Sequence, residues 1–93
     1  MTDKQLEYIL TIAQEKNITR AANKLLISQS SLSQLLAHVE DELGMELFSR
    51  NSLPLAPTYA GELFLKSARE VLEIKRNLLS KYSELKDETS GRI

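Results

Sequence analysis

A chain of 93 residues is the size of one small domain, and a domain this small buries so little surface that a partner chain would help to stabilise it. The absence of cysteine excludes disulfides, thiolate metal sites and a cysteine nucleophile. Twelve basic and thirteen acidic residues give a net charge of −1, so binding to a polyanion would depend on where the charges lie, not on their sum.

The N-terminal segment MTDKQLEY has neither the basic region nor the apolar region of a signal peptide. No run of eighteen apolar residues occurs elsewhere in the sequence. These features predict a soluble, cytoplasmic protein.

Acidic residues are missing from two windows of the sequence, 16–39 and 47–61. The basic residues near or inside these windows are Lys16, Arg20, Lys24 and Arg50. Between the windows lie four acidic residues, which we interpret as a solvated helix end: Glu40, Asp41, Glu42 and Glu46. The windows are the places where the surface can be locally positive.

The first part of the chain predicts two helices. Residues 4–16 carry apolar side chains at helical spacing, and Asn17 follows as a stop. A shorter helix is expected next, with Thr19 as its N-cap and with the adjacent Ala21 and Ala22 allowing a neighbouring helix to approach closely.

A third helix is predicted over SQSSLSQLLAHVEDEL, residues 28–43, with Ser28 as N-cap and Gly44 at the C-terminal end. Its apolar stripe consists of Leu32, Leu36, Val39 and Leu43. About three residues join it to the second helix, as in a helix-turn-helix, whose second helix can enter a DNA major groove.

The opposite face of this helix contains no Lys or Arg, only small, hydroxyl or amide side chains and one histidine. Such side chains can read base edges, glutamine by a bidentate contact to adenine. The candidate base-reading residues are Gln29, Ser30, Ser33, Gln34 and His38. Phosphates would then be bound by backbone N–H groups at helix starts, beside Thr19 and Ser28, and by basic residues on the flanks.

The stretch MELFSRNSLPLAPT contains two short apolar runs on either side of residues 50–52, and Pro54 and Pro57 exclude a long regular strand. We predict a small irregular hairpin, a wing, whose tip can reach the DNA backbone or the minor groove.

One long helix is expected over residues 58–87. Apolar residues recur every seven positions along it: Phe64, Val71, Leu78 and Leu85, beside Leu65, Leu72 and Leu79. Thirty helical residues span about 45 Å, whereas a compact domain of this size is about 30 Å across. The helix should therefore protrude, and a second copy of the chain is the expected cover for its stripe. The alternative is that the stripe packs only on its own domain and the helix end frays.

An enzyme is not expected, because there is one histidine, no glycine-rich phosphate loop and no evident carboxylate pair. The acidic cluster lacks the alternating spacing of a calcium loop. We therefore predict no cofactor and no metal site.

Five segments, in order and at matching spacing, resemble the N-terminal region of LysR-type transcriptional regulators. They are LEYI, ITRAANKL, SQSSLSQLLAHVEDELG, LFSR and TYAGE, which together extend from residue 6 to residue 62. The resemblance implies a mainly α winged helix-turn-helix in residues 1–57, a linker helix over 58–87 that pairs in a homodimer, and a tether over 88–93 to an effector domain absent from this chain.

The resemblance also implies transcription regulation by binding interrupted palindromes of double-stranded DNA in bacterial promoters, with tetramers possible in a full-length protein. Positions 29, 30, 33 and 34 would face bases. The residues implied near the backbone or in the wing are Thr19, Arg20, Lys24, Ser28, Arg50, Asn51 and Ser52. The residues implied in the dimer helix are Phe64, Val71, Leu72, Leu78, Leu79, Tyr82 and Leu85.

The chain departs from the family pattern at several positions of the expected DNA surface. The family usually has proline at Ser30, a basic residue at Gln34 and a more basic wing than residues 51–54 provide. These departures keep a second hypothesis open, in which a module of the same fold binds other proteins instead of DNA.

Overall fold

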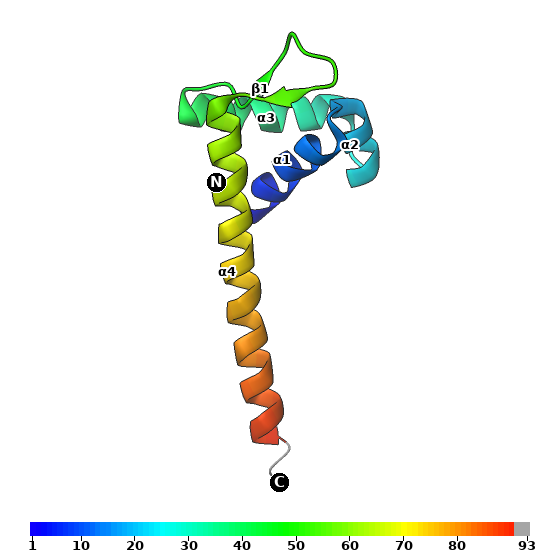
Figure 1. The fold of residues 1–93 in the computed structure, drawn as a ribbon. Helices are drawn as coiled ribbons and strands as arrows, with labels where there is room; N and C mark the ends of the chain where they lie inside the picture. Colours follow the sequence, from blue (N-terminus) through cyan, green and yellow to red (C-terminus); the bar gives the residue numbers. More distant parts are fainter. Residues whose placement is uncertain (91–93) are drawn as a thin grey trace.

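The computed structural model describes residues 1–90, with side chains through residue 88 (Figure 1). Its elements are α1 (Asp3–Glu15), α2 (Ile18–Leu25), α3 (Gln29–Leu43), β1 (Phe48–Ser49), β2 (Ala56–Pro57) and α4 (Tyr59–Ser90). Three short helices, a two-stranded hairpin and the first turns of α4 form a compact part of the molecule, residues 1–68, which we call the head. The rest of α4 extends from the head as a long helix. The predicted fold class, a winged helix-turn-helix followed by a long helix, is confirmed.

Asn17, and not Thr19, caps α2. Lys16 adopts a left-handed conformation with φ 56° and ends α1. Asn17 is then extended, and its side-chain oxygen accepts a hydrogen bond from the Arg20 N–H at 2.9 Å. The prediction of Thr19 as the N-cap was therefore wrong, because the chain turns two residues earlier and Thr19 lies inside the first turn of α2.

The two ends of α3 are formed as predicted. The Ser28 hydroxyl accepts a hydrogen bond from the Ser31 N–H at 3.1 Å. Gly44, with φ 72°, donates its N–H to the Glu40 carbonyl at 2.8 Å. Three residues join α2 to α3. The first of them, Leu26, is left-handed at φ 60° and ends α2, and its side chain is 91% exposed. The predicted helix-turn-helix is thus present.

The core of the head lies where α1, α2 and α3 meet the hairpin and the first turns of α4. Its buried side chains are Leu6, Ile9, Ile12, Ala21, Ala22, Leu32, Leu36, Val39, Leu47, Phe48, Leu65 and Ala68. Leu43, the last member of the predicted α3 stripe, is 42% exposed because it extends beyond the helices that cover the other three.

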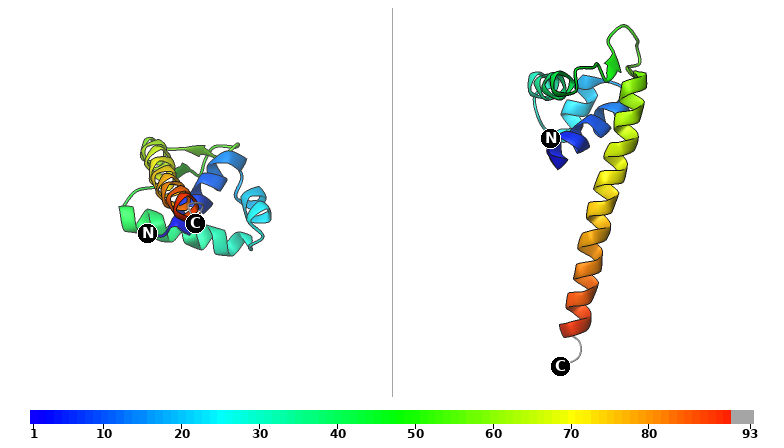
Figure 2. Two further views of the ribbon diagram at one scale, coloured as in Figure 1. Left: turned by 90° about the horizontal axis from the view of Figure 1, so that it is seen from below. Right: turned by 90° about the vertical axis from the view of Figure 1, so that its left-hand side faces the viewer.

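The hairpin is short and antiparallel, with Phe48 opposite Pro57 and Ser49 opposite Ala56. Its loop projects from the head on the side away from the distal end of α4 (Figure 2). The Leu55 N–H donates to the Lys16 carbonyl at 3.0 Å, which ties the returning arm of the wing to the end of α1.

The start of α4 is fixed against the hairpin by Thr58 and Gly61. The Thr58 hydroxyl donates to the Glu46 carbonyl at 2.6 Å and accepts from the Gly61 N–H at 3.0 Å. A Cβ on Gly61 would lie 1.9 Å from the Leu47 carbonyl oxygen. Only glycine allows this close approach, so residue 61 sets the angle at which α4 leaves the head.

Beyond the head, α4 extends far past the other helices, and the molecule measures 60 × 26 × 21 Å (Figures 1 and 2). An ion pair of 2.7 Å between Lys75 and Asp3 still joins it to α1. The helix runs to Ser90, so residues 88–90 of the expected tether continue the helix, and residues 91–93 lie outside the described residues. Among the described residues, no helix is long and apolar enough to cross a membrane.

Candidate nucleic-acid interface

The outer face of α3 carries hydrogen-bonding side chains without formal charge. Leu32, Leu36 and Val39 are fully buried against the head. Away from this stripe, Ser30, Gln34 and His38 are exposed and Ser33 is half-buried, and Gln29 is exposed because it stands in the first turn of the helix. The five predicted base-reading residues are therefore at least partly accessible on one helix, α3.

At the N-terminal end of this face, side chains from α2 and α3 are hydrogen-bonded to each other. The Thr19 hydroxyl donates to Gln29 Oε1 at 3.0 Å. The Ser28 hydroxyl lies 2.8 Å from Ser31 Oγ and 3.3 Å from Ser30 Oγ. The outer face of α3 thus begins in a hydrogen-bonded set of hydroxyl and amide groups.

The basic side chains beside α3 differ in their partners. Lys24 lies 3.4 Å from Glu15, and both side chains are partly exposed, so this surface pair contributes little to stability. Lys16 and Arg20 are exposed and form no ion pair within residues 1–88. These two cations are the ones most open to a phosphate.

Arg50 and Glu40 form an ion pair that the sequence did not reveal. Arg50 Nη2 lies 2.6 Å from Glu40 Oε1, and the other carboxylate oxygen accepts the Leu47 N–H at 2.6 Å. Glu40 is only 8% exposed, so its placement in a solvated acidic cluster was wrong. The physical reason is that the segment leading to β1 folds back over the C-terminal half of α3 and needs an acceptor there. Arg50 is therefore a wing-anchoring side chain as well as a candidate DNA contact.

The wing tip is uncharged. Asn51 is exposed, and the Ser52 hydroxyl donates to the Ser49 carbonyl at 3.3 Å. Leu53 is 94% exposed. A hollow of about 270 Å³ separates the wing from the starts of α2 and α3, and Thr19, Gln29 and Arg50 all line it. The three parts expected to contact DNA therefore border one depression.

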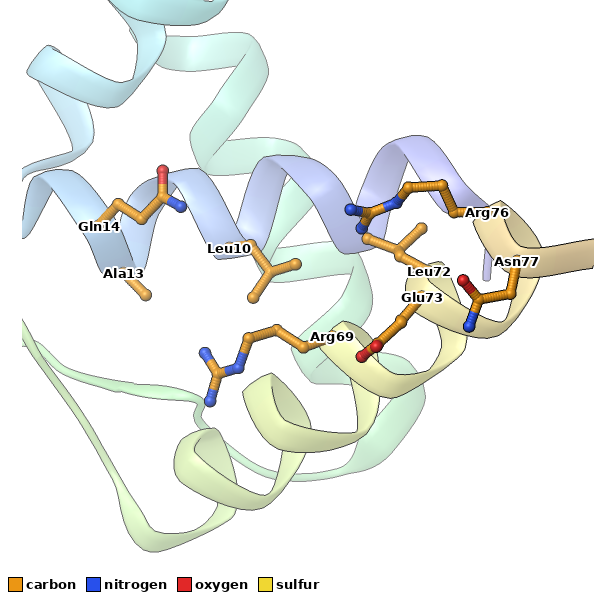
Figure 3. A pocket seen from close by; sticks show the side chains of 8 residues that line it. All are labelled: Leu10, Ala13, Gln14, Arg69, Leu72, Glu73, Arg76 and Asn77. Atoms are coloured by element: carbon orange, nitrogen blue, oxygen red, sulfur yellow. The ribbon is translucent and has the colours of Figure 1, made fainter. Parts of the chain in front are cut away.

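A larger hollow of about 670 Å³ lies on the side of α4 that faces α1 (Figure 3). Its walls are Leu10, Ala13 and Gln14 from α1 and Arg69, Leu72, Glu73, Arg76 and Asn77 from α4. It contains no histidine and no pair of carboxylates, so these walls offer no acid-base set. Within residues 1–90, no three histidine or carboxylate side chains are grouped to bind a metal ion.

Comparison with known sequences finds bacterial helix-turn-helix regulators. The family model described as "Bacterial regulatory helix-turn-helix protein, lysR family" matches residues 4–62. The HTH-type transcriptional regulator BsdA of Bacillus subtilis is 45% identical over the whole chain, which corresponds to 32% of BsdA. XapR of Escherichia coli is 34% identical over 97% of the chain and 31% of its own length. The chain spans about a third of the length of these relatives.

Solved structures agree in fold. A complex of BenM_DBD with benA site 1 DNA superposes with a TM-score of 0.87 at 32% identity, covering 91% of this chain and 96% of that one. DarR of Vibrio fischeri in complex with DNA gives a TM-score of 0.84 at 32% identity, covering 94% of this chain and 30% of that one. Because the family model covers more than half of the sequence, the chain belongs to the lysR family of bacterial regulatory helix-turn-helix proteins.

Proposed function

We propose that this chain is the DNA-binding part of a dimeric cytoplasmic transcriptional regulator, and that α3 reads double-stranded DNA in the major groove. The observation that carries the proposal is the set of accessible amide and hydroxyl side chains on α3, a helix that its buried stripe of Leu32, Leu36 and Val39 fixes in the head. Gln29, Ser30, Ser33, Gln34 and His38 are proposed to contact bases. The relatives are named as transcriptional regulators, and the structural neighbours BenM_DBD and DarR are in complex with DNA, which supports the proposal.

Phosphate contacts are proposed to come from outside α3's reading face. The N-terminal N–H groups of α2 and α3 attract anions, and Lys16 and Arg20 add positive charge beside them. Thr19 lies in the first turn of α2, Ser28 caps the start of α3, and Lys24 lies in the last turn of α2. Arg50, Asn51 and Ser52 would follow the flanking backbone or minor groove from the wing.

The dimer is proposed to form through the exposed stripe of α4. Its side chains beyond the head are 42–72% exposed: Val71, Ile74, Leu78, Leu79, Tyr82 and Leu85. An apolar hollow of about 370 Å³ continues this stripe into the head, between Leu6, Leu43 and Phe64. The stripe, the hollow and the half-buried Leu72 together offer a second copy of the chain a continuous apolar surface. Two copies would place one α3 on each half of an interrupted palindrome.

A second candidate, a protein-interaction module of the same fold, is favoured by one observation. The reading face of α3 has no Lys or Arg, and the wing tip is uncharged. A titration with mixed genomic DNA fragments at low salt separates the two candidates. Saturable binding that survives competitor DNA supports the regulator, whereas no binding at micromolar protein supports the interaction module.

The decisive variant is Gln29→Ala. Loss of one base contact should reduce discrimination between the selected site and other duplexes by about 1–3 kcal/mol, without a change in thermal stability. Gln14→Ala removes an exposed glutamine from α1 instead and should leave discrimination unchanged. Equal discrimination by both variants and the unaltered chain would contradict the assignment of Gln29 as a base contact.

A further inference from the structure

The contact between Thr19 and Gln29 joins the first turns of α2 and α3. Thr19 Oγ1 lies 3.0 Å from Gln29 Oε1, and both side chains are exposed on the head. A carboxamide oxygen can only accept a hydrogen bond, so the threonine hydroxyl is the donor. Without this contact, the terminal torsion of an exposed glutamine is broad and either end of the amide can point outward.

We propose that Thr19 is a specificity-determining positioning residue, which acts on DNA through Gln29. Its hydroxyl holds the Gln29 carbonyl toward α2 and leaves the amide NH₂ as the outward group. The inference rests on the proposed function and deepens it. Pre-ordering of this kind lowers the entropy cost of immobilising a flexible side chain at an interface.

A particular base preference follows from the chemistry of the outward group. An NH₂ group offers two donors and no acceptor. In the major groove, guanine presents two adjacent acceptors, O6 and N7, and thymine presents O4; adenine presents one acceptor, N7, beside an amino group, and cytosine presents an amino group. A bidentate contact to adenine would also need the carbonyl oxygen to point toward the base, whereas the Thr19 hydroxyl holds it toward α2. Gln29 therefore favours the keto bases, guanine and thymine, over the amino bases at the position it contacts.

The DNA test uses the whole chain and two substitutions. A randomised duplex pool enriched on the unaltered chain gives the selected site, and Gln29→Ala identifies the position that Gln29 reads. Thr19→Val removes the donor at nearly constant volume and should lower the keto-over-amino preference there by about fivefold, the worth of one hydrogen bond. Thr19→Ser keeps the donor and should retain the preference. If Thr19→Val also retains it, Thr19 does not set specificity.

A measurement without DNA separates this inference from the proposed function. The side-chain amide signals of Gln29 in the free chain, observed in a ¹⁵N correlation spectrum, should move with Thr19→Val and stay close to their original positions with Thr19→Ser. Unchanged signals in Thr19→Val would overturn the inference even if the chain binds DNA. If the pool yields no selected site, the proposed function fails, and the spectrum alone decides whether the hydroxyl holds the amide. Equal melting temperatures of both variants and the unaltered chain show that neither substitution has unfolded α2.

Discussion

The head and the distal part of α4 contain the same kind of helical apolar pattern, but the head buries its apolar side chains and the distal part of α4 exposes them. In the head, Ile9, Leu32 and Leu36 have no exposed surface. Along α4 beyond the head, Leu78 is 52% and Tyr82 is 64% exposed. The difference shows that an apolar stripe is buried only where another element lies close enough to cover it.

The boundary between these two regions falls within α4 itself. Leu65 and Ala68 are buried against the head, and Leu72 is half-buried. The Lys75–Asp3 pair follows, and both of its side chains are about half exposed, so it marks the edge of the contact more than it strengthens it. The head should therefore unfold as a unit whose stability depends on its own packing. The stability of the distal part of α4 should instead rise with protein concentration, because a second copy is its proposed cover.

The largest expected effect is the loss of packing at the root of α4. Leu65→Ala removes a side chain that is 5% exposed and should lower the free energy of unfolding of the head by about 2–5 kcal/mol. Leu63→Ala, two residues earlier in the same helix and 52% exposed, should change it by less than about 0.5 kcal/mol. Urea unfolding followed by circular dichroism measures both. Similar losses in the two variants would mean that α4 is not anchored through Leu65.

A charge on the distal stripe should break the proposed dimer and leave the head folded. Leu78→Asp should raise the dimer dissociation constant by at least about 30-fold, since a central interface side chain is worth 2 kcal/mol or more. Ser80→Asp adds the same charge on the other side of the helix and should remain dimeric. Sedimentation equilibrium at low micromolar concentration checks both variants. A dimer that persists in Leu78→Asp would show that the stripe is not the interface.

Much of the fold could be predicted because its signals are local. The helical spacing of apolar residues, the N-cap at Ser28 and the glycine at residue 44 each depend on a few neighbouring residues, and all were confirmed. The uncharged face of α3 was also visible, because a helix that buries Leu32 and Leu36 must expose the opposite side.

The remaining features depend on contacts between segments distant in sequence. Glu40 looked like its neighbours Asp41 and Glu42, and only the return of the chain toward β1 buries it beside the Leu47 N–H. The link between Thr19 and Gln29 was likewise hidden, since it requires the angle between α2 and α3. A local signal did exist for the true cap of α2, because Asn17 is as good an N-cap as threonine and stands directly before an apolar residue.

Glu40 is the charged exception to the apolar interior of the head. Glu40→Ala leaves the Leu47 N–H without its acceptor and Arg50 without its partner, and should lower the free energy of unfolding by about 2 kcal/mol. The substitution should also loosen the wing, which is observable as faster hydrogen exchange at Leu47. Glu42→Ala, an exposed carboxylate in the same turn of α3, is the matched control and should have little effect. If Glu42→Ala were as destabilising, the effect would come from helix charge and not from the buried carboxylate.

The smallest expected effect concerns the charges that the head offers to DNA. Lys24 and Arg50 have acidic partners, so Lys16 and Arg20 are the principal cations for phosphates, and a dimer should show a shallow slope of about −4 in a plot of log affinity against log salt concentration. Leu53→Arg puts a cation on the wing tip, where the side chain is 94% exposed, and should steepen the slope by about 2 per dimer. Leu53→Gln, a neutral change at the same position, should leave the slope unaltered. A slope near −10 for the unaltered chain would contradict this charge map, because several further cations of each copy, such as Lys24 and Arg50, would then have to reach the backbone.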